Sequence, residues 1–168
     1  MTRISETILV LFLTAAGTGI SGKSQKPPHI YIDVGACPFE CCKYGQWTVA
    51  KKVRVLDRPN GKQVIETLSK GDIVTGLTGE VISQPIPFNA DRDVPDTPIK
   101  RGDTLYVLHY DGEGYWKVWL DGKITLVHED VMEVPHPKSD WWVKIRDSHG
   151  TTGWALSNGN FAHQDACE

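Results

Sequence analysis

Four cysteines carry the most reactive side chains of this sequence. Cys37, Cys41 and Cys42 are clustered, and Cys167 lies far from them along the chain. A bond between the adjacent Cys41 and Cys42 requires strained geometry, which leaves Cys167 to pair with either of them and Cys37 with the other. Either pairing closes a loop of about 125 residues and is expected to stabilise the fold by constraining the unfolded chain.

Zinc binding is the alternative chemistry for these thiols, with His29 or His163 as a further ligand. Structural zinc sites commonly combine two cysteine pairs, whereas the second half here is the single Cys167. No neighbouring group marks a clustered cysteine as an activated nucleophile. We therefore expect two disulfides and no cofactor, and we keep a zinc or enzyme site in residues 37–42 as the competing hypothesis.

Residues 17–24 read Gly-Thr-Gly-Ile-Ser-Gly-Lys-Ser and match the spacing of a phosphate-binding loop. That chemistry needs a helix that begins at the Lys-Ser pair and directs its first N–H groups at the phosphates. Pro27 and Pro28 follow closely and cannot continue such a helix. We interpret the stretch as small residues around a cleavage site and do not expect nucleotide binding.

The layout of residues 1–22 is typical of a secretory signal peptide. Arg3 supplies the positive start, residues 8–13 form an apolar run, and small residues follow. The run is far shorter than the roughly 20 residues of a membrane-spanning helix. We predict cleavage between Ala16 and Gly22, an exported protein that is periplasmic or secreted, and no membrane span in the mature chain.

Acid–base chemistry has few candidates. His128, Glu129 and Asp130 are consecutive, a pattern that favours a solvated turn over a metal site. His109 fits a residue that pairs across a sheet, and Glu113 stands between two glycines in a turn. The sequence contains neither a nucleophile elbow nor a His-Glu-x-x-His motif, and we expect no catalytic site.

Aromatic residues crowd the second half of the chain and suggest a binding surface. Neighbours on a strand point to opposite faces, so Trp141 and Trp142 cannot both point inward. Exposed rings beside Asp and Lys suit a groove for a peptide or glycan. The competing interpretation is burial, since large apolar side chains of small domains mostly form the core. The predicted ligand-binding residues are Tyr110, Tyr115, Trp116, Trp119, Trp141 and Trp142.

Composition and charge indicate which elements position these residues. The 168 residues carry a net charge of -3, which gives no basic field for a nucleic acid. Sixteen Gly and ten Pro favour short strands joined by turns, and no helical period is present. We predict a mostly β protein with an irregular loop over 84–98. The expected strands are 48–50, 53–56, 63–68, 73–83, 116–121 and 142–147, with a hairpin through 111–114 and a final hairpin turn and closing strand over 148–156.

One pattern recurs at an offset of 31 residues: Ser-Lys-Gly-Asp at 69–72 and Lys-Arg-Gly-Asp at 100–103 both precede an apolar run. The strand expected at 116–121 is likewise echoed at 142–147. We therefore expect the chain to continue after the signal peptide as a cysteine-containing segment, 23–46, and two similar halves, 47–98 and 99–168.

These strands resemble the bacterial SH3-like (SH3b) domain. The resemblance covers residues 53–156 and is most specific over 142–155, where Trp-Val-Lys-Ile-Arg-Asp precedes a glycine turn and Gly-Trp-Ala. It implies SH3-like small barrels, either two in tandem or one elaborated barrel, because the strands are doubled and the loop at 85–98 is long. The cysteine-containing segment also resembles one that precedes such domains in exported bacterial proteins.

SH3b domains commonly contact peptidoglycan or short peptides, so the resemblance implies a ligand in the cell envelope. The function expected by this analogy is an exported, non-catalytic binding module of the bacterial envelope, whose exposed aromatic face holds a peptide, glycan or protein. A structural subunit that pairs with another envelope protein through the same face is a third possibility.

Overall fold

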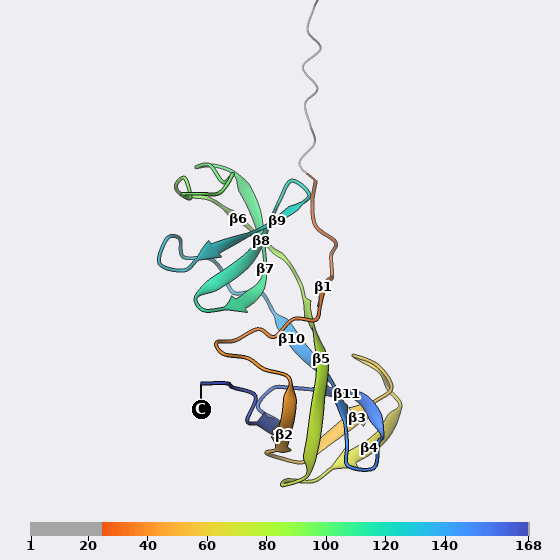
Figure 1. The fold of residues 1–168 in the computed structure, drawn as a ribbon. Helices are drawn as coiled ribbons and strands as arrows, with labels where there is room; N and C mark the ends of the chain where they lie inside the picture. The colour runs from red at the N-terminus through yellow and green to blue at the C-terminus, as the bar shows by residue number, and fades with distance from the viewer. Residues whose placement is uncertain (1–24, 168) are drawn as a thin grey trace, which may run out of the picture.

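The computed structural model describes residues 25–167, which form strands and no helix, so the expected mostly β class is confirmed. The predicted signal peptide and the phosphate-loop spacing lie outside these residues. The chain is organised as two lobes, one above the other in Figure 1. The strands of the described part are β1 (Tyr31–Val34), β2 (Gly45–Val49), β3 (Val53–Leu56), β4 (Val64–Leu68), β5 (Ile73–Ser83), β6 (Ile86–Asn89), β7 (Thr104–Gly112), β8 (Tyr115–Leu120), β9 (Lys123–His128), β10 (Ser139–Arg146), β11 (Thr152–Leu156) and β12 (Phe161–Ala162).

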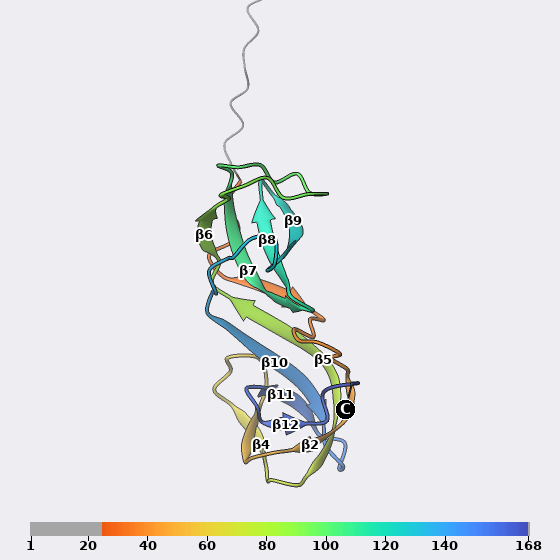
Figure 2. The same cartoon turned by 90° about the vertical axis from the view of Figure 1, so that its left-hand side faces the viewer.

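The large lobe is built on a curled antiparallel sheet with the strand order β12-β2-β5-β10-β11-β3-β4. β1 is off this path and pairs with the last residues of β5. The small lobe is a four-stranded antiparallel sheet with the order β6-β7-β8-β9. Figure 2 shows β5 and β10 running side by side from the large lobe to its junction with the small one.

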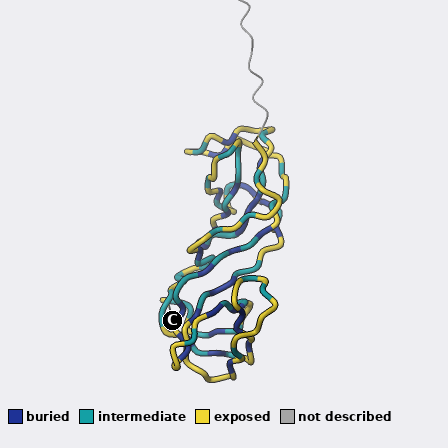
Figure 3. The backbone as a smooth tube through the Cα atoms, turned by 90° about the vertical axis from the view of Figure 1, so that its right-hand side faces the viewer, coloured by how far each residue is buried: buried dark blue, intermediate teal, exposed yellow. Residues whose placement is uncertain are grey.

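Each lobe encloses its own hydrophobic core, visible in Figure 3 as buried backbone inside both lobes. Strand alternation produces these cores, because every second residue of a strand points inward and the inward positions are mostly apolar. The large core contains Trp47, Val49, Val53, Val55, Leu68, Val74, Val143, Ile145, Ala155 and Phe161. The small core contains Ala90, Val94, Ile99, Leu105, Val107, Trp116, Val118, Val127, Met132 and Val134.

The recurring Gly-Asp pattern forms the same turn in both lobes. The Asp72 side chain accepts a hydrogen bond from the Ser69 N–H at 2.7 Å, and Asp103 accepts one from the Lys100 N–H at 2.7 Å. Gly71 and its counterpart Gly102 have φ angles of 95° and 91°, which glycine adopts without strain. These turns lead into β5 and β7, and the strand order β6-β7-β8-β9 then repeats β2-β5-β10-β11.

The two repeats are nested rather than consecutive. The small sheet, from β6 to β9, lies between β5 and β10 in the chain, and β10, β11 and β12 return to the large sheet. A division at residue 98 therefore does not coincide with the sheets. The predicted loop over 84–98 also contains β6, which pairs with β7 and with no other strand of residues 25–167. Pro87 is compatible with this strand because an edge strand leaves one side without partners.

Two glycines of β5 allow bulky rings to lie against the strand. A Cβ atom at Gly76 would overlap the Trp47 ring, and one at Gly79 would overlap Trp141 and Tyr44. Between these glycines the pairing register of β5 with β10 shifts by one residue. Glycines inside a strand indicate an irregularity of this kind. Gly79 thus leaves room for aromatic side chains at the junction of the lobes.

Candidate functional site

A cleft of about 290 Å³ lies beside this junction. β10 and the turn after β11 supply one wall, β7 supplies another, and the loop that carries three cysteines supplies a third. The lining combines aromatic, aliphatic and polar side chains, as small ligand sites do. It consists of Pro38, Val81, His109, Tyr110, Ser139, Asp140, Trp141, Leu156 and Asn158.

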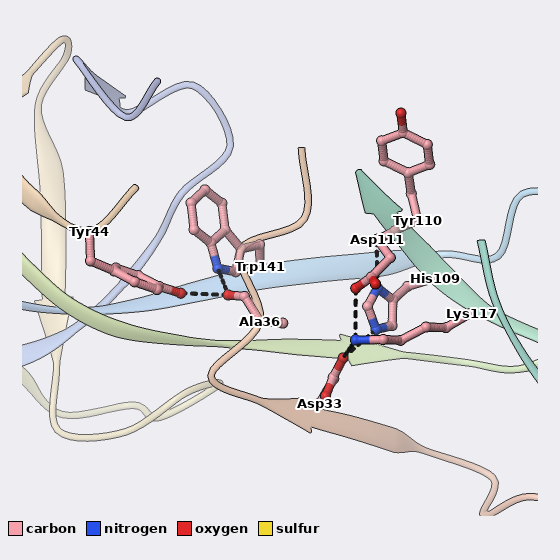
Figure 4. Close-up of polar contacts among 8 residues, drawn as sticks. All are labelled: Asp33, Ala36, Tyr44, His109, Tyr110, Asp111, Lys117 and Trp141. Atoms are coloured by element: carbon pink, nitrogen blue, oxygen red, sulfur yellow. Dashed lines mark hydrogen bonds and ion pairs between the residues drawn. The ribbon is translucent and has the colours of Figure 1, made fainter. Parts of the chain in front are cut away.

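The cysteine loop, residues 36–42, is held against the large lobe by the Ala36 carbonyl. This oxygen accepts hydrogen bonds from the Tyr44 hydroxyl at 2.5 Å and from Trp141 Nε1 at 3.1 Å (Figure 4). The Phe39 ring contacts the Trp141 indole edge-on, with centroids 5.5 Å apart. Burial raises the pKa of Tyr44, which keeps its hydroxyl a donor. The loop is therefore a fixed wall of the cleft.

Two disulfides close the same loop. Cys37 is bonded to Cys42, and Cys41 is bonded to Cys167, which selects one of the two pairings left open by the sequence. All four sulfurs are used in these bonds, so a zinc site built from thiolates requires reduction. The cysteines thus shape the cleft and tie the last described residues to the loop.

The small lobe contacts the cysteine loop through Tyr110. Its hydroxyl donates to Glu40 Oε1 at 2.6 Å and accepts the Gly114 N–H at 2.8 Å. The hydrogen bond to Glu40 is the main cause of a raised Tyr110 pKa. Tyr110 and Trp141 thus contact the loop from different lobes, and both residues line the cleft.

A partly buried ionic network, defined as Asp33, His109, Asp111 and Lys117, adjoins the cleft (Figure 4). Asp33 Oδ2 lies 2.8 Å from His109 Nε2 and 2.6 Å from Lys117 Nζ, and the same Nζ lies 2.7 Å from Asp111 Oδ1. Asp33 comes from β1, which pairs with β5 of the large lobe, and the others come from β7 and β8. The network therefore connects the lobes.

The network joins two carboxylates to one ammonium and one buried imidazole. His109 is only 1% exposed, and its Nδ1 lies 2.6 Å from the Tyr110 carbonyl while Nε2 faces Asp33. Burial alone would lower the Lys117 pKa, but the hydrogen bonds that its ammonium donates to Asp111 and Asp33 raise it overall. The Lys117 ammonium already occupies the position between the carboxylates that a metal ion would take.

The six aromatic residues predicted to bind a ligand do not lie on one face of the protein. Tyr110 and Trp141 line the cleft. Trp116 and Trp142 are 8% and 7% exposed, so burial removes them from any binding surface. Trp116 belongs to the small core because it faces inward from β8, and Trp142 points away from the neighbouring Trp141.

The two remaining aromatics lie elsewhere on the small lobe. Trp119 donates from Nε1 to the Gln25 carbonyl at 2.6 Å, and Tyr115 is 41% exposed with its ring against His128. Most exposed apolar side chains are aliphatic, and β1 with the residue before it presents Ile30, Ile32 and Val34. His128 also accepts the Asp130 N–H at 3.2 Å, as expected for a polar turn.

A second group of titratable residues, Glu66, Asp147 and His149, lies in the large lobe. Asp147 closes the turn before β11, because its carboxylate accepts hydrogen bonds from the backbone N–H groups of His149 at 3.0 Å and Thr151 at 2.6 Å. Burial would raise the Asp147 pKa, but these hydrogen bonds and the one from the His149 ring lower it overall. Glu66 Oε2 is buried near this carboxylate and has no hydrogen-bond partner among the described residues.

Replacing Glu66 with glutamine is therefore expected to stabilise the protein at neutral pH. Burial and the nearby Asp147 raise the Glu66 pKa, so the folded state loses stability as pH rises from 4.5 through that raised value. The introduced glutamine amide has no charge and can donate to Asp147, and we expect a gain of about 1 kcal/mol. Thermal melting across pH measures the difference, which should shrink as the pH falls. An equal gain at all pH values would contradict this explanation.

The family resemblance inferred from the sequence gains no support from other proteins. No family model, no curated protein and no solved structure matches this chain. The cleft, the disulfides and the nested sheets are therefore the features that bear on the function of this protein. Within the described residues, no helix is long and apolar enough to cross a membrane.

Proposed function

We propose that this protein is an exported, non-catalytic binding module of the cell envelope that holds a peptide or peptidoglycan-type ligand in the cleft between its lobes. The observation that carries the proposal is the pairing of Tyr110 and Trp141 across one cleft with polar groups beside them. Aromatic rings bind peptides and sugars through their faces, and adjacent polar groups orient the ligand.

Two further observations support the proposal. Two disulfides in this chain suit an oxidising compartment outside the cytoplasm, as the predicted signal peptide requires. The repeated strand order and Gly-Asp turns fit a nested pair of SH3-like motifs, although this assignment still rests on the sequence resemblance.

The side chains of the cleft argue for binding rather than catalysis. Ser139 and His109 both line it, and together they are the components of a hydroxyl nucleophile with a base. However, both His109 nitrogens are engaged, one by the Tyr110 carbonyl and one by Asp33. The imidazole is thus not free to accept a proton from Ser139.

Sedimentation with purified peptidoglycan sacculi tests the proposed function. Ser139 is exposed, so Ser139→Tyr should fill the cleft without disturbing a core, and we expect it to weaken binding about tenfold or more. Trp141→Ala should do the same, with its melting temperature checked because Trp141 also packs against the large core. Tyr115→Ala, an exposed aromatic outside the cleft, is the control and should bind normally. Loss of binding in the control alone would refute the assignment to the cleft.

A further inference from the structure

A cavity of about 100 Å³ in the large lobe brings acidic side chains together. Glu66 comes from β4, Asp147 directly follows β10, and His149 belongs to the turn before β11. In the described part of the chain, no lysine or arginine lines this cavity or forms an ion pair with its acids. The rest of the lining consists of Leu68, Asp72, Ile73 and Ser148. Three carboxylates therefore share one imidazole.

The spacing of three of these side chains is close to that of a metal site. One donor atom from each of Glu66, Asp147 and His149 lies within 4.8 Å of the other two. Asp147 Oδ2 and His149 Nδ1 are 3.0 Å apart. Zinc binds carboxylate oxygen and imidazole nitrogen at about 2.0–2.2 Å, which places the donors of a tetrahedral site about 3.4 Å apart. The His149 side chain is 83% exposed, so it is free to adjust toward the two carboxylates.

The Glu66 carboxylate points to a cation on separate grounds. Its Oε2 atom is buried, and no donor group of residues 25–167 reaches it. A buried carboxylate oxygen without a partner is costly, and the nearby Asp147 carboxylate adds repulsion. A cation bound between Glu66 and Asp147 removes both costs.

The Asp147 side chain is held in place for such a contact. It is only 3% exposed, and Oδ1 accepts the backbone N–H groups of His149 and Thr151. These two bonds leave Oδ2 facing the His149 ring. Hydrogen bonds of this kind orient the carboxylates that bind metal ions in proteins.

We infer that Glu66, Asp147 and His149 form a binding site for a divalent transition-metal ion of the zinc type. Two carboxylates and an imidazole suit such an ion better than Mg²⁺ or Ca²⁺, which prefer oxygen ligands alone. The site uses no cysteine and so differs from the thiolate site considered from the sequence. The bound ion joins β4 to the turn between β10 and β11 and stabilises the folded state. The site shares no residue with the cleft, so the inference does not depend on the proposed function.

Isothermal titration calorimetry of the untagged, disulfide-bonded protein with Zn²⁺ tests the site. The unaltered protein should bind one ion at this site, and Glu66→Gln and His149→Ala should each weaken that binding about tenfold or more. His128→Ala is the matched control, because His128 also faces an aspartate, Asp130 at 3.6 Å, but lies outside the cavity. The control should bind Zn²⁺ like the unaltered protein. Mg²⁺ at the same concentrations should not bind.

Thermal melting separates lost binding from lost folding. In EDTA, Glu66→Gln is expected to melt above the unaltered protein, so its weaker Zn²⁺ binding cannot result from unfolding. A free Zn²⁺ concentration of a hundred times Kd should raise the melting temperature of the unaltered protein and of His128→Ala by about 5–10 °C. At that concentration, Glu66→Gln and His149→Ala should change much less.

Three results would each overturn the inference: no Zn²⁺ binding by the unaltered protein, an affinity that is the same in all four proteins, or equally tight binding of Mg²⁺. Loss of binding in His128→Ala alone would also overturn it, because the ion would then belong to the turn after β9. Each of these results leaves the proposed function standing, since sacculus binding depends on the cleft.

Discussion

Replacing Cys41 and Cys167 with serine is expected to lower the free energy of unfolding by about 5 kcal/mol. This disulfide joins residues 126 apart in the sequence, so it excludes a large number of extended conformations from the unfolded chain. It also ties the C-terminal residues to the cysteine loop, where the Ala166 N–H donates to the Cys41 carbonyl at 2.8 Å. Equilibrium urea unfolding under non-reducing conditions measures the loss.

The Cys37–Cys42 disulfide provides the matched control, because it joins residues only 5 apart. The same chain-entropy relation gives about 2 kcal/mol for Cys37→Ser with Cys42→Ser. The two double variants remove the same number of sulfur atoms and differ mainly in loop length. An equal loss in both would show that local packing of the cysteine loop, rather than the closure of the long loop, determines the stability.

Local sequence rules predict much of this fold. The expected strands at 53–56 and 73–83 are confirmed with the same bounds, as β3 and β5. Turn residues explain this success, since Asn60 with Gly61 and Gly71 with Asp72 mark where the neighbouring strands end. The hairpin at 111–114 is also confirmed by β7 and β8.

Long-range pairing is what the sequence does not reveal. The recurrence at an offset of 31 residues fits consecutive repeats as well as nested ones, because both place the same turns before the same strands. The choice depends on β10 pairing with β5 across an insertion of more than fifty residues, and no local signal encodes that contact. No strand is expected at the position of β6 for a different reason: the prolines in and around it favour an irregular loop.

Two of the residues expected to bind a ligand line the cleft, and their role in binding stays a prediction. Tyr110 and Trp141 were among the expected ligand-binding residues, but Asp140 and the ionic network were not. One available signal is the alternation of Ile30, Ile32 and Val34 with Tyr31 and Asp33, which marks an amphipathic strand with an acid on its inner side. The exposed aliphatic side and the partly buried acid invert the usual pattern, so no strand is expected within the cysteine-containing segment, 23–46.

Replacing Asp33 with asparagine is expected to lower the free energy of unfolding by about 2–3 kcal/mol. Removing one partner of a buried ion pair typically costs about 3–5 kcal/mol, and water reaches this network in part. The Asp33 and Lys117 side chains are 18% and 22% exposed, which places the expected loss below that range. Asparagine keeps the shape of the side chain but leaves His109 without an anionic partner. Urea unfolding at neutral pH measures the loss.

Two further variants show whether this loss comes from the buried charges. Asp91→Asn removes an acid from the exposed ion pair with Arg92, whose side chains are 58% and 59% exposed, and should leave stability unchanged. Combining Asp33→Asn with Lys117→Met should cost less than the sum of the single changes, because each single change leaves one charge of the pair without this partner, whereas the double variant removes both charges. Additive losses would mean that Asp33 and Lys117 act independently. Coupled losses, together with normal stability of Asp91→Asn, would identify the network as a connection that fixes β1 to the small lobe.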